Sequence, residues 1–199
     1  MFLPTLVMMA KAPRAGLVKT RLAREIGTAE ALRFYRANLS STTRLLSGDG
    51  RWRFVLSVAP DWAIHEPVWP AGIAAIPQGF GNLGTRMQRV LDRMPPGPVV
   101  IIGADIPGIR RWHVADAFKR LGEADAIFGP AHDGGYWLVG VKRRPHIPCI
   151  FSNVRWSGPH ALEDTVTNLS GKRIAFCNTL ADVDTAEDFY AWRRGDRIS

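Results

Sequence analysis

Two aspartates stand where a carboxylate could hold a metal ion. Asp105 closely follows the apolar, β-branched run Val99–Ile102, and Asp133 precedes Gly134 and Gly135. A carboxylate at the end of a buried strand can bind Mg²⁺ or Mn²⁺, which then bridges nucleotide phosphates. One carboxylate rarely suffices for a hard cation, so we predict that both aspartates act together. A helix cap at the first and an Asp-Gly hairpin turn at the second are the alternatives.

Four cations are concentrated in the segment KAPRAGLVKTRL, residues 11–22. The segment lies between an apolar run and a helical pattern, and a helix N-terminus with cations beside it is a ready site for phosphate. The segment matches neither a Walker A loop nor GxGxxG. We therefore predict a phosphate-binding loop, with a basic helix start on the surface as the alternative. The four cations are Lys11, Arg14, Lys19 and Arg21.

A glycine-rich segment, QGFGNLGTRM at residues 78–87, precedes another helical pattern. Glycines let the backbone approach a ligand closely, here a base or a ribose, and the arginine could reach a phosphate. A flexible connection explains the glycines equally well. The residues predicted to bind a nucleotide here are Gln78, Gly79, Gly84 and Arg86. Gly134 and Gly135 would likewise let the backbone approach a ligand closely, and we predict that they contact the acceptor of a transfer reaction.

The segment DVDTAEDF, residues 182–189, fits a helix start. Asp184 and Glu187 have the spacing of a capping box, so we expect a structural role for them. The histidines and cysteines lack metal-binding spacing, and the chain has no nucleophile elbow. The predicted catalytic residues are therefore Asp105, Asp133 and Lys19.

The elements that position these residues alternate between strands and helices. Apolar runs predict strands, and apolar stripes every three or four residues predict helices. Such alternation is typical of an α/β layered fold with a mostly parallel sheet, which binds ligands at the carboxyl ends of its strands. No linker or repeat divides the chain, so we expect one domain over residues 1–199. The predicted strands are 3–10, 52–59, 73–76, 99–102, 124–128, 136–141 and 173–177, and the predicted helices are 19–26, 28–46, 87–94, 114–121, 160–169 and 185–192.

Composition excludes several classes of protein. The 199 residues are 46% apolar and 22% charged, unlike a disordered or collagen-like chain. Cys149 and Cys177 cannot form a disulfide framework and are expected to be free thiols in a reducing compartment. The apolar run near the N-terminus is too short to span a membrane, and it lacks the preceding cations of a signal peptide. We therefore expect a cytoplasmic protein.

The net charge is positive, because 26 Lys and Arg outnumber 18 Asp and Glu to give +8 at pH 7. Such an excess suggests an anionic partner, which could be a phosphorylated small molecule, a nucleic acid or an acidic membrane surface. No long basic run with interleaved aromatic residues occurs, which disfavours a dedicated nucleic-acid surface. A generally basic surface is the remaining explanation.

Several segments together resemble the DUF2064 family. They follow the family order from Ala10 to Phe189 and are AKAPRAGLVKTRL, QGFGNLGTRM, GAD-P, GPAHDGGYWLVG, FSNVRWS and DVDTAEDF. The resemblance implies the GT-A, nucleotide-diphospho-sugar transferase superfamily, with an αβα sandwich and a mixed sheet. Relatives implied by the resemblance include phospholactate guanylyltransferases and molybdenum-cofactor nucleotidyltransferases.

The resemblance also assigns roles to residues. It implies that Gly16 joins the four cations in the phosphate loop and that Asp105 is the metal-binding carboxylate. Asp133 would stand near the second metal or acceptor position, and Trp156 and Ser157 would line the acceptor side.

Four positions depart from the family pattern, and one of them is His132, which is atypical there. Asn82 stands where an acid is expected, Ala104 where a serine is expected, and Ile106 where a small polar residue is expected. The last two flank the metal position, so they bear on metal affinity and acceptor choice.

The expected function is metal-dependent glycosyl transfer from a nucleotide-diphospho-sugar to a small-molecule acceptor, with Asp133 as base. One alternative is a nucleotidyltransferase acting on a small phosphorylated substrate, in which Lys19 and Arg14 stabilise charge on a triphosphate. The other is a non-catalytic nucleotide-binding protein, which would bind its ligand without a metal.

Overall fold

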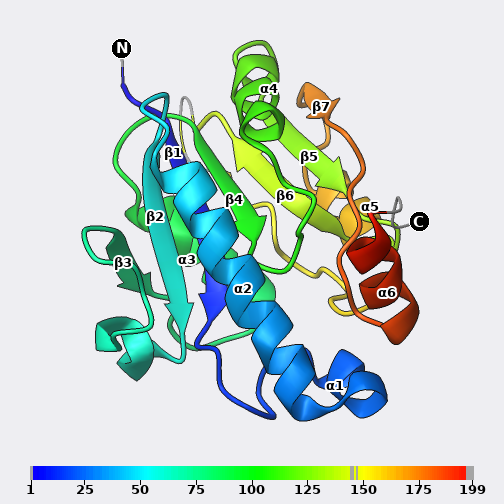
Figure 1. Ribbon diagram of the computed structural model, residues 1–199. Coiled ribbons are helices and arrows are strands. Elements are labelled where there is room, and N and C mark those ends of the chain that lie inside the picture. Colours follow the sequence, from blue (N-terminus) through cyan, green and yellow to red (C-terminus); the bar gives the residue numbers. More distant parts are fainter. Residues whose placement is uncertain (1, 144–145, 147, 196–199) are drawn as a thin grey trace.

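A seven-stranded sheet forms the centre of the molecule, and the computed structural model describes residues 2–143, 146 and 148–195 (Figure 1). The strands lie in the order β3-β2-β1-β4-β6-β5-β7. They are β1 (Thr5–Lys11), β2 (Arg53–Ala59), β3 (Ala74–Pro77), β4 (Val99–Gly103), β5 (Ala126–Pro130), β6 (Tyr136–Val141) and β7 (Ile174–Phe176). The helices are α1 (Thr20–Ile26), α2 (Thr28–Ser47), α3 (Leu83–Arg93), α4 (Arg111–Leu121), α5 (Ala161–Thr167) and α6 (Ala186–Arg194), with a 3₁₀ turn η1 (Asp61–His65).

The sheet is mixed and mostly parallel. β1 pairs in parallel with β2 and β4, β2 with β3, and β5 with β7, whereas β6 runs antiparallel to both β4 and β5. The predicted α/β architecture is therefore confirmed. The predicted strands and helices all form, with ends displaced by a few residues.

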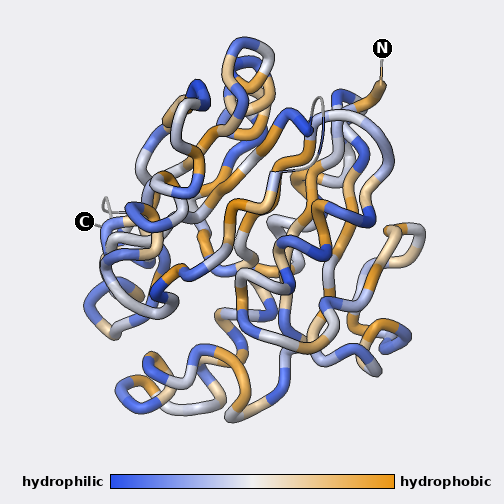
Figure 2. The backbone as a smooth tube through the Cα atoms, turned by 180° about the vertical axis from the view of Figure 1, so that it is seen from behind, coloured by the Kyte–Doolittle hydropathy of each residue, from blue (hydrophilic) through white to orange (hydrophobic). Residues whose placement is uncertain are grey.

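The sheet is buried on both faces because its strands carry apolar side chains in both directions. Along β1, Leu6 and Met8 pack into the core on one face with α2 and α4, while Val7 packs on the other face with α3. This is the two-residue alternation of a strand. Figure 2 shows the hydrophobic colour concentrated along the central strands. The result is the expected αβα sandwich.

β1 is the point where the order of the strands reverses. The chain goes from β1 to β2 and β3 on one side, and later returns to β4 on the other side. Loops that follow two such neighbouring strands leave the sheet in opposite directions, which opens a crevice at their carboxyl ends. The loops that follow β1 and β4 carry Lys19 and Asp105.

A separate small apolar cluster attaches the end of the chain to its beginning. Leu22 of α1 and Phe34 of α2 pack with Val183 and with Phe189 of α6. The rings of Phe34 and Phe189 meet edge to face with centroids 5.5 Å apart. This cluster fixes the segment before α6 beside the segment before α1.

Among the described residues, no helix combines the length and apolar character needed to cross a membrane.

Candidate functional site

A cavity of about 450 Å³ opens at the carboxyl ends of β1 and β4. Its wall contains apolar side chains together with charged groups of both signs. The polar residues in its wall are Lys11, Lys19, Thr20, Arg21, Tyr35, Gln78, Arg86, Asp105, Tyr136 and Asp184.

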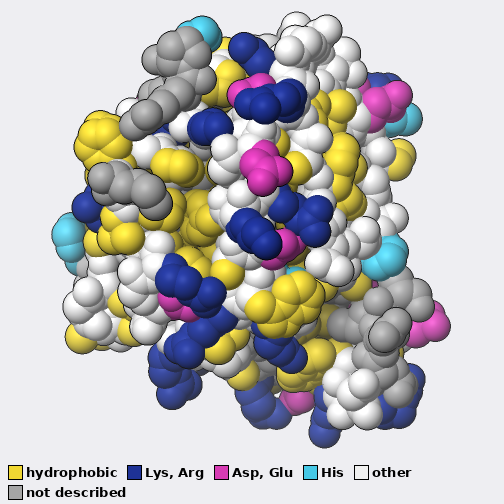
Figure 3. All heavy atoms as spheres, turned by 90° about the horizontal axis from the view of Figure 1, so that it is seen from above, with side chains coloured by type: hydrophobic (Ala, Val, Ile, Leu, Met, Phe, Trp, Pro, Cys, Tyr) yellow, Lys and Arg dark blue, Asp and Glu magenta, His cyan; other side chains and the backbone are white. Residues whose placement is uncertain are grey.

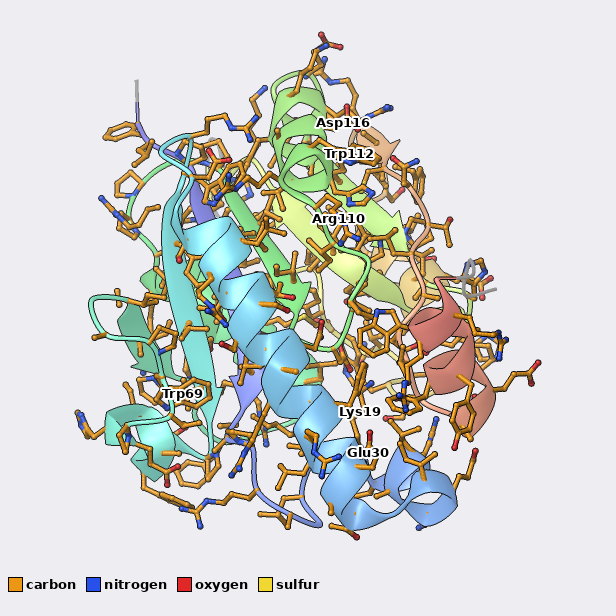
Figure 4. The ribbon with its side chains drawn as sticks, viewed as in Figure 1. Lys19, Glu30, Trp69, Arg110, Trp112 and Asp116 are labelled. Carbon is orange, nitrogen blue, oxygen red and sulfur yellow. The ribbon has the colours of Figure 1, made fainter. Side chains whose placement is uncertain are left out.

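Lys19 is the buried cation of this site, with only 5% of its side chain exposed. Its Nζ lies 2.8 Å from Asp184 Oδ1, 3.3 Å from Asp105 Oδ2 and 3.9 Å from Asp182 Oδ2. Its backbone is left-handed, with φ of 46°, a conformation that is uncommon and costly for a residue with a side chain. In Figure 4 Lys19 lies between α2 and α6. We call Lys19 and the three aspartates around it, Asp105, Asp182 and Asp184, the Lys19 cluster.

The Lys19 ammonium is held in its charged form. Burial acts to lower the pKa of Lys19, but the carboxylates of Asp105, Asp184 and Asp182 outweigh it, so the pKa is raised. A buried cation is stable only with such partners. The cluster therefore consists of one charged ammonium surrounded by three carboxylate groups.

Asp105 does not cap a helix. α4 begins at Arg111, where Arg110 is the N-cap and its backbone N–H donates to His113 Nδ1 at 2.9 Å. Asp105 instead turns back over Gly103, because a Cβ at Gly103 would stand 2.8 Å from Asp105 Oδ1. Its side chain is 42% exposed, so it faces both Lys19 and the cavity.

Ala104 and Ile106 are largely buried beside Asp105. They are 4% and 3% exposed and belong to the core. The Ala104 carbonyl accepts a hydrogen bond of 2.9 Å from the buried Asn38 side chain. Ala104 also lines the cavity, where its methyl group provides no polar atom in the place of the expected serine, whereas Ile106 lies outside the cavity wall.

Asp184 was expected to form a capping box with Glu187, and that expectation is wrong. The helix cap of α6 consists of Thr185 and Asp188, one residue beyond the predicted pair. Val183 is fully buried in the small apolar cluster. In an extended chain, neighbouring side chains point in opposite directions, so burying Val183 directs both of its neighbours, Asp182 and Asp184, toward Lys19.

Asp182 has a strongly perturbed acidity. Burial raises its pKa most, the charge of Asp184 raises it further, and Lys19 only partly compensates, which leaves the pKa at about 6. Asp105 and Asp133 also contribute in the upward direction. Asp182 lies beside the cavity rather than in its wall, and perturbed carboxylates are common at functional sites.

Further cations line the cavity beside the Lys19 cluster. Lys11 and Arg86 belong to its wall, and the Arg21 Nη1 lies 3.7 Å from Asp184 Oδ2. The backbone of Lys11 is fixed by the Tyr35 hydroxyl, which donates to its carbonyl and accepts from its N–H at 3.0 Å. Five of the residues predicted to bind a nucleotide thus line one cavity. Four are the cations Lys11, Lys19, Arg21 and Arg86, and the fifth is Gln78.

Two members of the predicted phosphate loop lie elsewhere. The Arg14 guanidinium pairs with Glu66 and stacks on Trp62 at 4.3 Å from the ring centroid, so it is directed toward η1. Gly16 forms an open turn with φ of 74° and has no atom within 4 Å of the place where a Cβ would lie. Neither residue lines the cavity.

Asp133 occupies the hairpin turn between β5 and β6, the alternative considered for it. Its Oδ1 accepts from the Gly135 N–H at 2.9 Å. Gly134 has φ of 81°, and a Cβ there would stand 2.2 Å from the Pro159 carbonyl oxygen. These residues lie outside the cavity wall. Their glycines are explained by the turn and by the close approach of residue 159.

The predicted glycine-rich segment is a rigid loop. The Gln78 amide donates to the Ser57 and Ala10 carbonyls at 2.9 and 3.2 Å, which ties the loop to β2 and β1. The Gly79 N–H donates to Asp61 at 2.8 Å. Asn82, the departure from an expected acid, is the N-cap of α3 and accepts from the Thr85 N–H at 2.9 Å.

Gly84 and Trp156 pack against each other. A Cβ at Gly84 would stand 2.6 Å from Trp156 Cζ2 and 2.9 Å from Phe151 Cβ. Gly84 therefore permits close packing of α3 against Trp156 and Phe151. Ser157 is exposed and has φ of 65°. Both predicted acceptor residues lie outside the cavity wall.

The Lys19 cluster fits a divalent cation in its chemistry. Within the described part of the chain, no group of three or more His, Cys, Asp and Glu side chains is arranged to hold a metal ion. The carboxylates of Asp105 and Asp184 nevertheless converge on one ammonium, and such oxygens are the ligands that Mg²⁺ and Mn²⁺ prefer. Because Mg²⁺ is commonly held by one or two carboxylates together with substrate phosphates, the fit requires a phosphate-bearing ligand.

Known structures share this fold. A candidate nucleotide-diphospho-sugar transferase from Desulfovibrio desulfuricans G20 is 27% identical over 98% of this chain and 88% of that chain, with a TM-score of 0.87. The manganese complex of Rv0371c from Mycobacterium tuberculosis H37Rv is 14% identical over 95% and 97% of the two chains, with a TM-score of 0.59. CMP:2-keto-3-deoxy-manno-octonic acid synthetase with CTP is 12% identical over 96% and 97%, also with a TM-score of 0.59. The last two show likeness of fold alone.

No curated protein sequence matches this chain. A family model does match, over residues 42–158, and its description is "Uncharacterized protein conserved in bacteria (DUF2064)". This range covers more than half of the chain and contains β4, Asp105 and the β5–β6 hairpin. The protein is therefore a member of the DUF2064 family.

Proposed function

We propose that this protein is a transferase that takes a nucleotide-diphospho-sugar as donor and binds it in the cavity at the carboxyl ends of β1 and β4. The observation that carries the proposal is the Lys19 cluster beside a cationic wall, at the point where the strand order reverses. Carboxylates and cations set side by side suit a metal–diphosphate group, which presents both charges. The description of the Desulfovibrio structure supports the same class of donor.

The roles follow from the geometry. Lys11, Arg21 and Arg86 would bind the donor phosphates from the wall of the cavity. Asp105 and Asp184 would hold Mg²⁺ or Mn²⁺, which when bound neutralises charge on the departing diphosphate. Lys19 already neutralises the same carboxylates and would turn its ammonium toward the phosphates as they arrive.

Asp133 stays a prediction as the base for an acceptor hydroxyl. It lies outside the cavity wall, yet its charge reaches Asp182. An acceptor bound over the β5–β6 hairpin would approach it.

Nucleotidyl transfer is the second candidate, and one observation favours it. The described cavity wall contains no carboxylate outside the Lys19 cluster, so a base for a neutral hydroxyl is not at hand. A phosphate nucleophile is already anionic and needs no base. Such a reaction would release pyrophosphate from a triphosphate, whereas glycosyl transfer would release a nucleoside diphosphate.

The test is a thermal-shift screen of nucleoside triphosphates and nucleotide-diphospho-sugars, with Mn²⁺ or with chelator. A ligand that binds only the folded state raises its melting temperature. We expect one donor to stabilise the wild type only with Mn²⁺, and Asp105→Asn and Asp184→Asn to abolish that shift. Asp116→Asn is the matched control, because Asp116 lies on α4 at the far end of the molecule from Lys19 (Figure 4).

Product analysis of the stabilising donor then separates the two reactions. Release of a nucleoside diphosphate supports glycosyl transfer, and release of pyrophosphate supports nucleotidyl transfer. A shift that ignores both the metal and the two carboxylates would leave a non-catalytic nucleotide-binding protein and would refute the proposal.

A further inference from the structure

Phe80 is the most exposed large apolar side chain among the described residues, at 87%. It lies in the loop 78–82, between Gly79 and Gly81. Keeping a full aromatic ring in water gives up the free energy of its burial. A single exposed ring is common on protein surfaces, so a role for Phe80 must be judged from how its loop is held and where it lies.

The loop around Phe80 is held in place rather than loose. The Arg89 guanidinium donates to the Gln78 carbonyl at 2.5 Å and to the Phe80 carbonyl at 2.9 Å. The Arg86 Nε donates to the Gly81 carbonyl at 2.9 Å. With the bond from Gly79 to Asp61, these contacts fix the backbone on both sides of the ring.

The two glycines determine that the ring is presented outward. Gly79 and Gly81 have φ of 75° and 110°, conformations that side chains rarely adopt. A Cβ at Gly79 would stand 2.6 Å from the Arg89 guanidinium. The backbone therefore turns sharply before and after Phe80, and no neighbouring side chain covers it.

The same loop forms part of the cavity wall. Gln78 and Leu83 both line the cavity, as does Arg86, which bonds to the residue after Phe80. Leu83 is itself 47% exposed. Phe80 is not itself a wall residue, but it follows Gln78 and precedes Leu83, which both are, so its exposed ring is presented beside a cavity whose wall carries charged groups.

A nucleotide is complementary to a charged cavity with an exposed aromatic ring beside it. Its phosphates are anionic and bind metal, and its base is a flat ring with an apolar face. Aromatic side chains bind bases by stacking on that face. We propose that Phe80 is the residue on which the nucleobase of the donor stacks, which rests on the proposed function and adds the half of the ligand that Lys19 and the aspartates do not contact.

The experiment measures dissociation constants by calorimetry in the presence of Mn²⁺. The probes are ATP, GTP, CTP and UTP, and inorganic tripolyphosphate, which has the phosphates without the base. We expect Phe80→Ala to weaken binding of the preferred nucleotide by about tenfold or more, the size expected for loss of one stacked base. Tripolyphosphate should bind Phe80→Ala and wild type equally.

Two further variants separate stacking from general apolar contact. Phe80→Trp should keep nucleotide affinity near that of the wild type, and Phe80→Leu should lose most of it. Phe2→Ala, which removes another exposed ring near the N-terminus, should change neither affinity. Because Phe80 is exposed, Phe80→Ala should melt within a degree or two of the wild type.

Each remaining outcome contradicts the inference in a recognisable way. Equal nucleotide affinity for Phe80→Ala and wild type overturns the stacking role but leaves the proposed function standing. Equal weakening of nucleotide and tripolyphosphate shows that the substitution disturbs the loop and also overturns it. A wild type that binds neither probe refutes the proposed function and the inference together.

Discussion

At the scale of single residues, Lys19 decides the electrostatics of the site. One ammonium contacts carboxylates that are 86 and 165 residues away in the chain. Burial raises the pKa of Asp182 most, and the neighbouring carboxylate of Asp184 raises it further, to about 6, because Lys19 compensates only in part. The site is therefore prepared for additional positive charge, which a divalent cation would supply.

Asp182→Asn should stabilise the protein near neutral pH. The folded pKa lies above the ordinary value, so the folded state binds more protons than the unfolded state between about pH 4 and pH 6. The contribution of Asp182 to stability is thus favourable below this window and is lost as pH rises through it. Two pKa units correspond to about 3 kcal/mol, which solvent exposure of the carboxylate reduces to about 1–2 kcal/mol.

The measurement is urea unfolding of both proteins with chelator present. The advantage of Asp182→Asn should be near zero at pH 4 and reach its full size at pH 7.5. A variant less stable than the wild type at pH 7.5 would show that the charge of Asp182 is needed rather than tolerated.

At the scale of elements, short segments with buried flanking residues aim the functional groups. Val183 anchors the loop before α6, and Ala104 and Ile106 anchor the loop after β4. Because these neighbours are buried in the core, Asp105 and Asp184 are directed toward the cavity. The elements therefore position the site through their apolar residues.

Gly134→Ala tests how tightly one such element is fixed. A Cβ at Gly134 would collide with the Pro159 carbonyl, whereas one at Gly16 would enter open space, although both residues have positive φ. The left-handed conformation alone should cost Gly16→Ala about 1 kcal/mol. The collision should cost Gly134→Ala about 1–3 kcal/mol more, as in other overpacked positions. Denaturant unfolding measures both, and equal losses would mean that the hairpin yields freely.

At the scale of the whole molecule, the positive charge is widely distributed. Figure 3 looks onto the end of the molecule opposite the cavity and shows many Lys and Arg side chains there as well. The net charge of +8 therefore does not single out the cavity. A generally basic surface accounts for much of it.

This distribution predicts weak, non-specific binding of nucleic acid that is separate from the site. Affinity for single-stranded DNA, followed by fluorescence anisotropy, should fall at least about tenfold between about 50 and 200 mM salt, because it rests on counterion release. Lys19→Met should leave this affinity unchanged, since the side chain is buried. If the substitution abolished binding of DNA, the cavity itself would be a nucleic-acid site.

The sequence by itself determined the alternation of strands and helices, and with it the fold class. It also placed Asp105 and several cations at the ends of strands, because periodicity and strand ends are local properties of the chain. It could equally well have drawn attention to Asp182 and Asp184, whose alternation around a valine directs both to one side.

Only the tertiary structure decided which charged groups meet. Docking of α6 on α1 and α2 brought Asp184 to Lys19, while Glu66 and Trp62 drew Arg14 away and the hairpin held Asp133 outside the cavity wall. Such contacts depend on strand order and on packing between distant segments. A pattern read over ten or twenty residues does not contain that information, because the free energy that selects each pair arises when separate elements pack together.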